Sequence, residues 1–156
     1  MNMKTNSLLE KVIIQKMPPV HSDNRRAIYD PQKITNDLEG DWYAHNLMEI
    51  YGQNIFNADC LLGKHHHDYE EVFFIPSGIL DFLLIDPENP KQISKIKLDS
   101  GKRLFIPKGV DHLTFNKGNN PAILMGYGNV PFDPKRLIPS NGEVLKILLS
   151  EAKQYF

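Results

Sequence analysis

The stretch GKHHHDYEEVFFIPSG, residues 63–78, joins a run of ionisable side chains directly to an apolar segment of β type. Three histidines and two glutamates fall within the seven positions from 65 to 71. Charged and imidazole side chains rarely lead into a buried strand unless something compensates them. A metal ion is one explanation, and an exposed polar turn is the other.

The alternation of a β-strand sorts these side chains into two sets. His65, His67 and Glu71 would share one face with Tyr69 and Phe73, while His66 would lie on the other. A turn within the stretch would change the position of Glu71. Two imidazoles at i and i+2 with a nearby carboxylate are suitable ligands for a divalent transition metal.

A second stretch, GKRLFIPKGVDHLTFN at residues 101–116, has a strand–turn–strand pattern. Gly101, Pro107 and Gly109 shape the turn. His112 then opens the following strand, on the same face as Asn116. The sequence therefore offers a third histidine that could join the first two.

Together the two stretches resemble the paired motifs of the cupin superfamily. The first motif is H-x-H, three or four residues, E, six residues and G, and it corresponds here to His65, His67, Glu71 and Gly78. The second is G, five residues, P-x-G, two residues, H, three residues and N, and it corresponds to Gly101, Pro107, Gly109, His112 and Asn116. One position departs: the glycine that the family places six residues before the first histidine is Asp59, although Gly63 lies nearer.

The resemblance spans about residues 42–127 and implies an all-β fold, the cupin double-stranded β-helix or jelly-roll barrel. It also implies one divalent transition metal at the mouth of the barrel, bound by His65, His67, Glu71 and His112. His66 is not expected to be a ligand. Fe, Mn, Ni, Zn and Cu all suit three imidazoles and one carboxylate, so the ligand types do not choose the metal.

The rest of the chain fits one domain of short strands. At 156 residues a single core is expected. We expect an N-terminal strand and arm over residues 1–41, the barrel over 42–127, and a C-terminal loop and helix over 128–156. Strands are predicted at residues 12–17, 42–51, 54–62, 65–75, 79–85, 92–98, 103–106, 112–116 and 122–127, with Gly and Pro between them.

The C-terminal helix is predicted from apolar residues at a spacing of four. Val144, Leu148 and Ala152 recur on one face of such a helix. Ser140 and Glu143 have the spacing of a capping box at its start. This face either packs on the barrel or meets a partner, and together with the N-terminal arm it suggests a homodimer.

Composition excludes several classes of function. The net charge of −1 and the absence of a dense basic run argue against nucleic-acid binding. No apolar stretch approaches the length of a membrane span or a signal-peptide core, so a cytoplasmic protein is expected. The single cysteine, Cys60, rules out an intrachain disulfide and is expected to be a small buried residue; a reactive thiol or a metal ligand is the alternative.

Further candidate site residues have two interpretations each. Tyr69 and Tyr127 are candidate acid–base groups alongside Glu71, or packing residues. Asn116 either binds substrate or closes a turn. Arg103, with Lys102, either meets an anionic substrate or is solvated. His45 is a possible base or a structural histidine.

The substrate is expected to be a small polar molecule. SDNRRAIYD, residues 22–30, resembles the D-x-R-G segment that precedes the jelly roll in nucleotide-sugar epimerases and ketoisomerases, with Arg26 at the glycine position. On that resemblance Arg25 is a candidate substrate-binding residue; salt bridges of Arg25 and Arg26 across a dimer are the alternative. The leading hypothesis is a metal-dependent sugar or nucleotide-sugar isomerase or epimerase. An Fe(II)-dependent dioxygenase and a non-enzymatic ligand-binding cupin are the alternatives.

Overall fold

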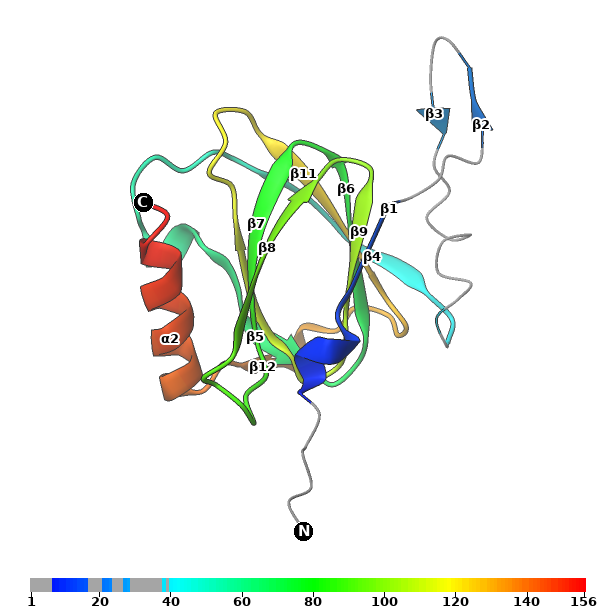
Figure 1. The fold of residues 1–156 in the computed structure, drawn as a ribbon. Coiled ribbons are helices and arrows are strands. Elements are labelled where there is room, and N and C mark those ends of the chain that lie inside the picture. Colours follow the sequence, from blue (N-terminus) through cyan, green and yellow to red (C-terminus); the bar gives the residue numbers. More distant parts are fainter. Residues whose placement is uncertain (1–6, 17–20, 24–26, 29–37, 39) are drawn as a thin grey trace.

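Two five-stranded antiparallel sheets face each other in the computed structural model, which describes residues 7–16, 21–23, 27–28, 38 and 40–156 (Figure 1). The first sheet has the order β1-β9-β6-β11-β4 and the second β12-β5-β10-β7-β8. The first comprises β1 (Ile13–Lys16), β9 (Lys102–Ile106), β6 (Glu71–Ser77), β11 (Ala122–Gly128) and β4 (Tyr43–Ile50). The second comprises β12 (Leu137–Pro139), β5 (Leu62–His67), β10 (Asp111–Phe115), β7 (Ile79–Ile85) and β8 (Ile93–Asp99). The predicted jelly-roll architecture is confirmed.

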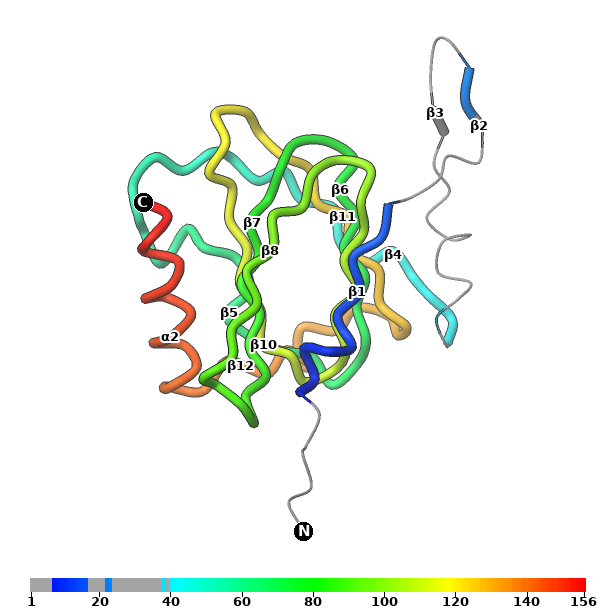
Figure 2. The backbone as a smooth tube through the Cα atoms, viewed as in Figure 1, coloured from blue at the N-terminus to red at the C-terminus, as the bar shows by residue number. Residues whose placement is uncertain are grey.

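The main core lies between the two sheets, and the remaining elements lie outside it. Strands β6, β7 and β10 are buried on both faces, which explains why their sequences are almost continuously apolar. The inner core includes Phe73, Leu84 and Leu104. Helix α2 (Gly142–Lys153) covers the outer face of the second sheet, where it packs against β7 and β10, and Figure 2 shows it alongside that sheet.

Helix α2 confirms the predicted face and corrects its start. Val144, Leu148 and Ala152 are buried against the second sheet. The N-cap is Asn141, whose side chain accepts hydrogen bonds from the N–H groups of Glu143 and Val144. The predicted cap, Ser140, directs its hydroxyl to a different residue, which is described with the site below.

Two predicted strands needed correction. The single strand expected over residues 65–75 is two strands, β5 and β6, separated by a turn at residues 68–70. The strand expected over 54–62 is a loop with the 3-10 turn η2 (Ala58–Cys60), in which Cys60 is exposed rather than buried. The turn is stabilised by the side chain of Asn57, which accepts from the N–H of Asp59, so local side-chain chemistry overrides the apolar pattern there.

The N-terminal region contributes a strand to the barrel. The 3-10 turn η1 (Leu8–Lys11) precedes β1, which pairs with β9. The short strands β2 (His21–Ser22) and β3 (Ala27–Ile28) pair with each other. After β11, the 3-10 turn η3 (Pro134–Arg136) leads into β12, a strand that the sequence did not predict. None of the described helices is long and apolar enough to cross a membrane.

Candidate metal centre and its pocket

Three predicted ligands converge from two neighbouring strands. His65 and His67 lie on β5 and His112 lies on β10, where His112 is the direct partner of His65 in the ladder. One ring nitrogen of each histidine lies within 4.8 Å of those of the others. Two metal–ligand bonds of about 2.1 Å span at most about 4.2 Å, so the three nitrogens lie near the separation that one ion requires.

A β-bulge brings His65 into this position. Leu113 pairs with Gly63 and His112 pairs with His65, so Lys64 is an extra residue in β5, and its φ of 68° is left-handed. Gly63 has a φ of 87°, and a Cβ there would lie 2.5 Å from the carbonyl oxygen of His112. Only glycine suits both conditions. Gly63 therefore supplies the tight backbone that the bulge requires next to His112.

Glu71 completes the set although a turn separates it from the histidines. It opens β6 in the opposite sheet and is 2% exposed. Its Oε2 lies 3.2 Å from Nε2 of His67 and 3.9 Å from Nε2 of His112. The alternation of side chains that grouped these residues does not continue through the turn at residues 68–70. Glu71 nevertheless lies beside the histidines, because its sheet faces theirs.

Burial keeps His65 and His112 able to bind a cation. It lowers the pKa of His112 to about 3, although the charge of Glu71 opposes the effect. Burial also lowers the pKa of His65 to about 4, and His67 adds to that shift. The Nδ1 of His112 lies 3.3 Å from the carbonyl oxygen of Val110, which favours an N–H at that atom and leaves the lone pair on Nε2.

The residues present suit a divalent metal. Among the described residues, the buried Oε2 of Glu71 has no hydrogen-bond donor, although imidazole nitrogens surround it. A buried carboxylate beside neutral imidazoles is costly unless a cation joins them. His65, His67, His112 and Glu71 would hold that cation.

His45 is the functional candidate that the sequence left most open. Ala44 pairs with Tyr127 and Asn46 pairs with Gly126, so His45 is the extra residue of a second bulge, which turns its ring inward. Its Nε2 lies 3.5 Å from Oε1 of Glu71, and its side chain is almost fully buried. Burial is the main cause that lowers the pKa of His45.

A glycine makes room for this ring. A Cβ at position 128 would lie 2.9 Å from Nε2 of His45 and 3.1 Å from Cε2 of Tyr69. Gly128 ends β11 and directly follows Tyr127, where the register against β4 shifts. The feature of the sequence that could have indicated the role of His45 is therefore Gly128, a residue far along the chain that no local pattern relates to His45.

The four candidate ligands and His45 line a pocket of about 240 Å³. The ring of Phe132 stacks on His45 at 5.6 Å and is 47% exposed, so it forms the rim. The pocket is lined by the three ligand histidines, Glu71, His45, Asn46, Thr114 and several apolar residues, Met48, Leu62, Phe73, Leu124, Phe132 and Leu137 among them.

Tyr69 lies beside the centre but outside the wall of this pocket. Its ring is 4.5 Å from that of His67 and lies beneath the guanidinium of Arg136 at 5.2 Å. Burial, with Glu71 next in importance, raises the pKa of Tyr69 to about 12. The phenol therefore stays protonated at neutral pH and could only donate a proton.

Other predicted site residues lie elsewhere. Tyr127 packs with Val72, Phe74 and Phe105 on the outer face of the first sheet. Arg103 is 5% exposed, not solvated, and donates to the side-chain oxygen of Gln15 on β1. Neither residue lines the pocket.

Asn116 and His66 also have other partners, and Arg25 lies outside the described residues. The amide of Asn116 donates to the carbonyl oxygens of Ile50 and Asn120 and accepts from the N–H of Gly118, which is the turn-closing alternative. His66 faces away from the three histidines and contacts Asp111.

The family follows from a comparison of the whole sequence. The family model described as Cupin matches residues 44–143, well over half of the chain. The chain is a cupin. No curated protein sequence matches it.

Solved structures of similar fold agree with this assignment. The TDP-fucose-3,4-ketoisomerase of Campylobacter jejuni is 23% identical with a TM-score of 0.64, covering 88% of this cupin and 95% of that chain. A 3,4-ketoisomerase of Thermoanaerobacterium thermosaccharolyticum, solved with TDP-4-keto-6-deoxyglucose, is 18% identical with a TM-score of 0.64, covering 93% and 96%. The dTDP-6-deoxy-D-glucose-3,5-epimerase of Legionella pneumophila is 15% identical with a TM-score of 0.65, covering 88% and 74%. At these identities the likeness shows the shared fold.

Proposed function

We propose that this cupin is a metal-dependent isomerase or epimerase of a sugar or nucleotide-linked sugar. One observation carries the proposal. Glu71 contacts the candidate ligand His67 through Oε2 and a separate histidine, His45, through Oε1, and all three residues line one pocket. Enzymes that move a proton beside a carbonyl need both a group that stabilises the oxyanion and a group that carries the proton.

The size of the pocket supports part of a nucleotide sugar as ligand. Pockets for drug-sized molecules measure about 300–1,000 Å³, whereas this one measures about 240 Å³. A single sugar ring is a suitable occupant, with any nucleotide lying outside the rim at Phe132. The similar structures named for keto-sugar nucleotides make this substrate class the first to test.

The residues divide the chemistry between them. A divalent metal held by His65, His67, His112 and Glu71 would polarise a sugar oxygen next to the reacting carbon. His45 is the residue placed to take the proton from that carbon. Return of the proton to the former carbonyl carbon, while the proton of the adjacent hydroxyl passes to the former carbonyl oxygen, gives a ketoisomer. Return of the proton to the opposite face of the same carbon gives an epimer.

Solvent proton exchange tests the proposal. The protein, with one equivalent of Mn²⁺ or Zn²⁺, would be incubated in D₂O with TDP-4-keto-6-deoxyglucose, and the loss of the carbon-bound proton signals next to the keto group would be followed by NMR. We expect exchange that continues under nitrogen and falls at least about 100-fold in His45→Gln. Binding without exchange across a panel of keto-sugar nucleotides would contradict the proposal and indicate a ligand-binding cupin.

A second candidate, an Fe(II)-dependent dioxygenase, is favoured by the apolar part of the pocket. Met48, Leu62, Leu124 and Leu137 offer no hydrogen bonds to sugar hydroxyls. The same ligand set leaves open positions on iron for a substrate and oxygen. Oxygen uptake with Fe(II) that stops under nitrogen would favour this candidate over the isomerase.

A further inference from the structure

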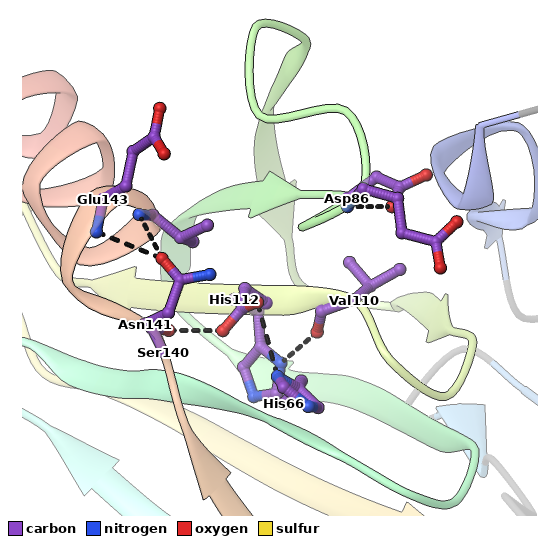
Figure 3. Close-up of polar contacts among 10 residues, drawn as sticks. His66, Asp86, Val110, His112, Ser140, Asn141 and Glu143 are labelled. Atoms are coloured by element: carbon purple, nitrogen blue, oxygen red, sulfur yellow. Dashed lines mark hydrogen bonds and ion pairs between the residues drawn. The ribbon is translucent and has the colours of Figure 1, made fainter.

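A polar cluster lies on the outer face of the second sheet, directly behind the metal ligands. It consists of His66 on β5, Asp111 on β10 and Ser140, which follows β12. These three strands are neighbours in the order β12-β5-β10. Figure 3 shows His66, His112, Ser140 and the capping residue Asn141 close together where the chain enters helix α2.

Residues of this cluster are direct sequence neighbours of the candidate ligands. His66 lies between His65 and His67, and Asp111 directly precedes His112. Side chains of consecutive strand residues point to opposite faces, so the cluster and the ligand set occupy the two faces of the same strand segments. A slip of one residue between β5 and β10 would exchange the two sets.

Because of the bulge at Lys64, a further contact is needed to fix the register of β5 against β10. The ladder between β5 and β10 changes register between His112 and Leu113, because Lys64 is the extra residue. The pairing of Gly63 with Leu113 therefore does not by itself fix where His65 and His67 stand against His112.

Ser140 binds both sides of this irregular pairing. Its N–H donates to the carbonyl oxygen of Lys64 at 3.0 Å, and its hydroxyl donates to Oδ1 of Asp111. Asp111 is 1% exposed. Its Oδ2 lies 3.3 Å from Nδ1 of His66, an ion-pair distance without the alignment of a hydrogen bond. The bond to Ser140 is therefore the stronger attachment.

We propose that Asp111, through Ser140, is a positioning residue that sets the register of β5 against β10 and thereby the spacing of His65, His67 and His112. The inference rests on the metal site of the proposed function, and it does not depend on the isomerase reaction. A buried carboxylate could instead serve the stability of the fold alone. The two roles differ in what they do to metal affinity.

Asp86 is a matched control for stability. It is also buried and accepts from the hydroxyl of Ser7 and the N–H of Leu8 at 2.7 Å, so it fastens the N-terminal turn instead of the ligand strands. Asp111→Ala and Asp86→Ala both remove a buried acceptor and leave its donors unpaired.

The experiment measures Mn²⁺ and Co²⁺ affinity by titration calorimetry, with the visible absorption of bound Co²⁺ as a report of ligand geometry. We expect Asp111→Ala to weaken binding about 10-fold or more and to change the Co²⁺ spectrum, as loss of outer partners does at other metal sites. Asp86→Ala should stay within about twofold, since it shares no partner with the ligands. Ser140→Ala should weaken binding and Ser140→Thr, which keeps the hydroxyl, should restore it.

Two results would overturn the inference. In the first, Asp111→Ala has the metal affinity and Co²⁺ spectrum of the wild type and loses stability as Asp86→Ala does. The cluster would then be purely structural. A wild-type protein that binds neither metal would remove the site that Asp111 is said to position. Proton exchange on keto sugars is measured separately, so failure of the proposed function is distinguishable from both results.

Discussion

At the scale of single residues, neighbours in sequence have opposite surroundings. His65 and His67 face the pocket, whereas His66 between them contacts Asp111 on the outer face. Three consecutive histidines thus differ in role because the strand turns each one by half a revolution.

Substitution of single histidines should separate these roles. His67→Ala or His112→Ala should lower metal affinity at least about 100-fold, because each removes a direct ligand. His66→Ala should keep nearly full metal content, because its contact with Asp111 is not an aligned hydrogen bond. Elemental mass spectrometry of protein purified without affinity histidines measures this, and an emptied site in His66→Ala would show that the ligand face is assigned wrongly.

The depressed pKa of His112 predicts how stability depends on pH in metal-free protein. The folded-state pKa of about 3 lies below the ordinary value of 6.5, so below pH 6.5 the unfolded chain takes up a proton that the folded protein does not. The free energy of unfolding should therefore fall as pH drops from 6.5 toward 4. The slope from His112 is up to about 1.4 kcal/mol per pH unit; His65, which water reaches, adds less.

Urea unfolding in the presence of a chelator between pH 4.5 and 7.5 measures this slope. His112→Asn removes the titrating group and should flatten the curve relative to the wild type. Parallel curves for the two proteins would mean that the His112 imidazole is protonated in the folded state as readily as in the unfolded one.

At the scale of elements, two bulges shape the site. The bulge in β5 sets the position of His65, and the bulge in β4 turns His45 toward Glu71. Both irregularities depend on pairing with a strand distant in sequence, β10 in one case and β11 in the other.

Gly128→Ala should disturb the second bulge. The added methyl group would approach Nε2 of His45 to 2.9 Å, so the ring must shift. We expect at least about 10-fold less activity in the proton-exchange assay, with a cooperative fold retained. Gly142→Ala is the control, because a Cβ at this first helical position meets nothing within 4 Å; it should leave activity unchanged, and equal losses in both variants would contradict the role assigned to the Gly128 space.

At the scale of the whole molecule, the hydrophobic cores are built without the metal site. The inner core between the sheets and the second core under α2 draw on apolar residues from seven strands and a helix. The four candidate metal ligands belong to neither of these cores. The expected homodimer stays a prediction; exposed apolar residues such as Leu47 on the edge strand β4 are available to it.

Removal of the metal should therefore lower the free energy of unfolding without unfolding the protein. Free metal at 100 times its dissociation constant stabilises a folded protein by about 2.7 kcal/mol, so a chelator should lower the melting temperature but leave one cooperative transition. Calorimetry with and without EDTA measures this. Loss of the transition in EDTA would show instead that the metal is a structural staple.

The amino-acid sequence was enough to predict the jelly roll and the apolar face of the C-terminal helix, and it grouped four candidate metal ligands whose side chains the structure brings together. The helix face follows from a short-range rule, the helical spacing of four. The jelly roll and the ligand set were implied by the resemblance of two motifs to those of cupins, with glycine and proline marking the turns. The motif spacing was sufficient to group His65, His67, Glu71 and His112, although the turn at residues 68–70 went unpredicted.

The division of the remaining candidates between the site and the scaffold depends on the three-dimensional fold. It placed His45 in the pocket, Tyr127 and Arg103 on the outer face of the first sheet, and Asn116 in a turn. A bulge, a space left by a distant glycine, and a bond such as that of Ser140 to Asp111 arise from pairing between segments far apart in the chain. The local sequence pattern does not indicate this pairing, because the same residues show the same periodicity whichever strand they pair with.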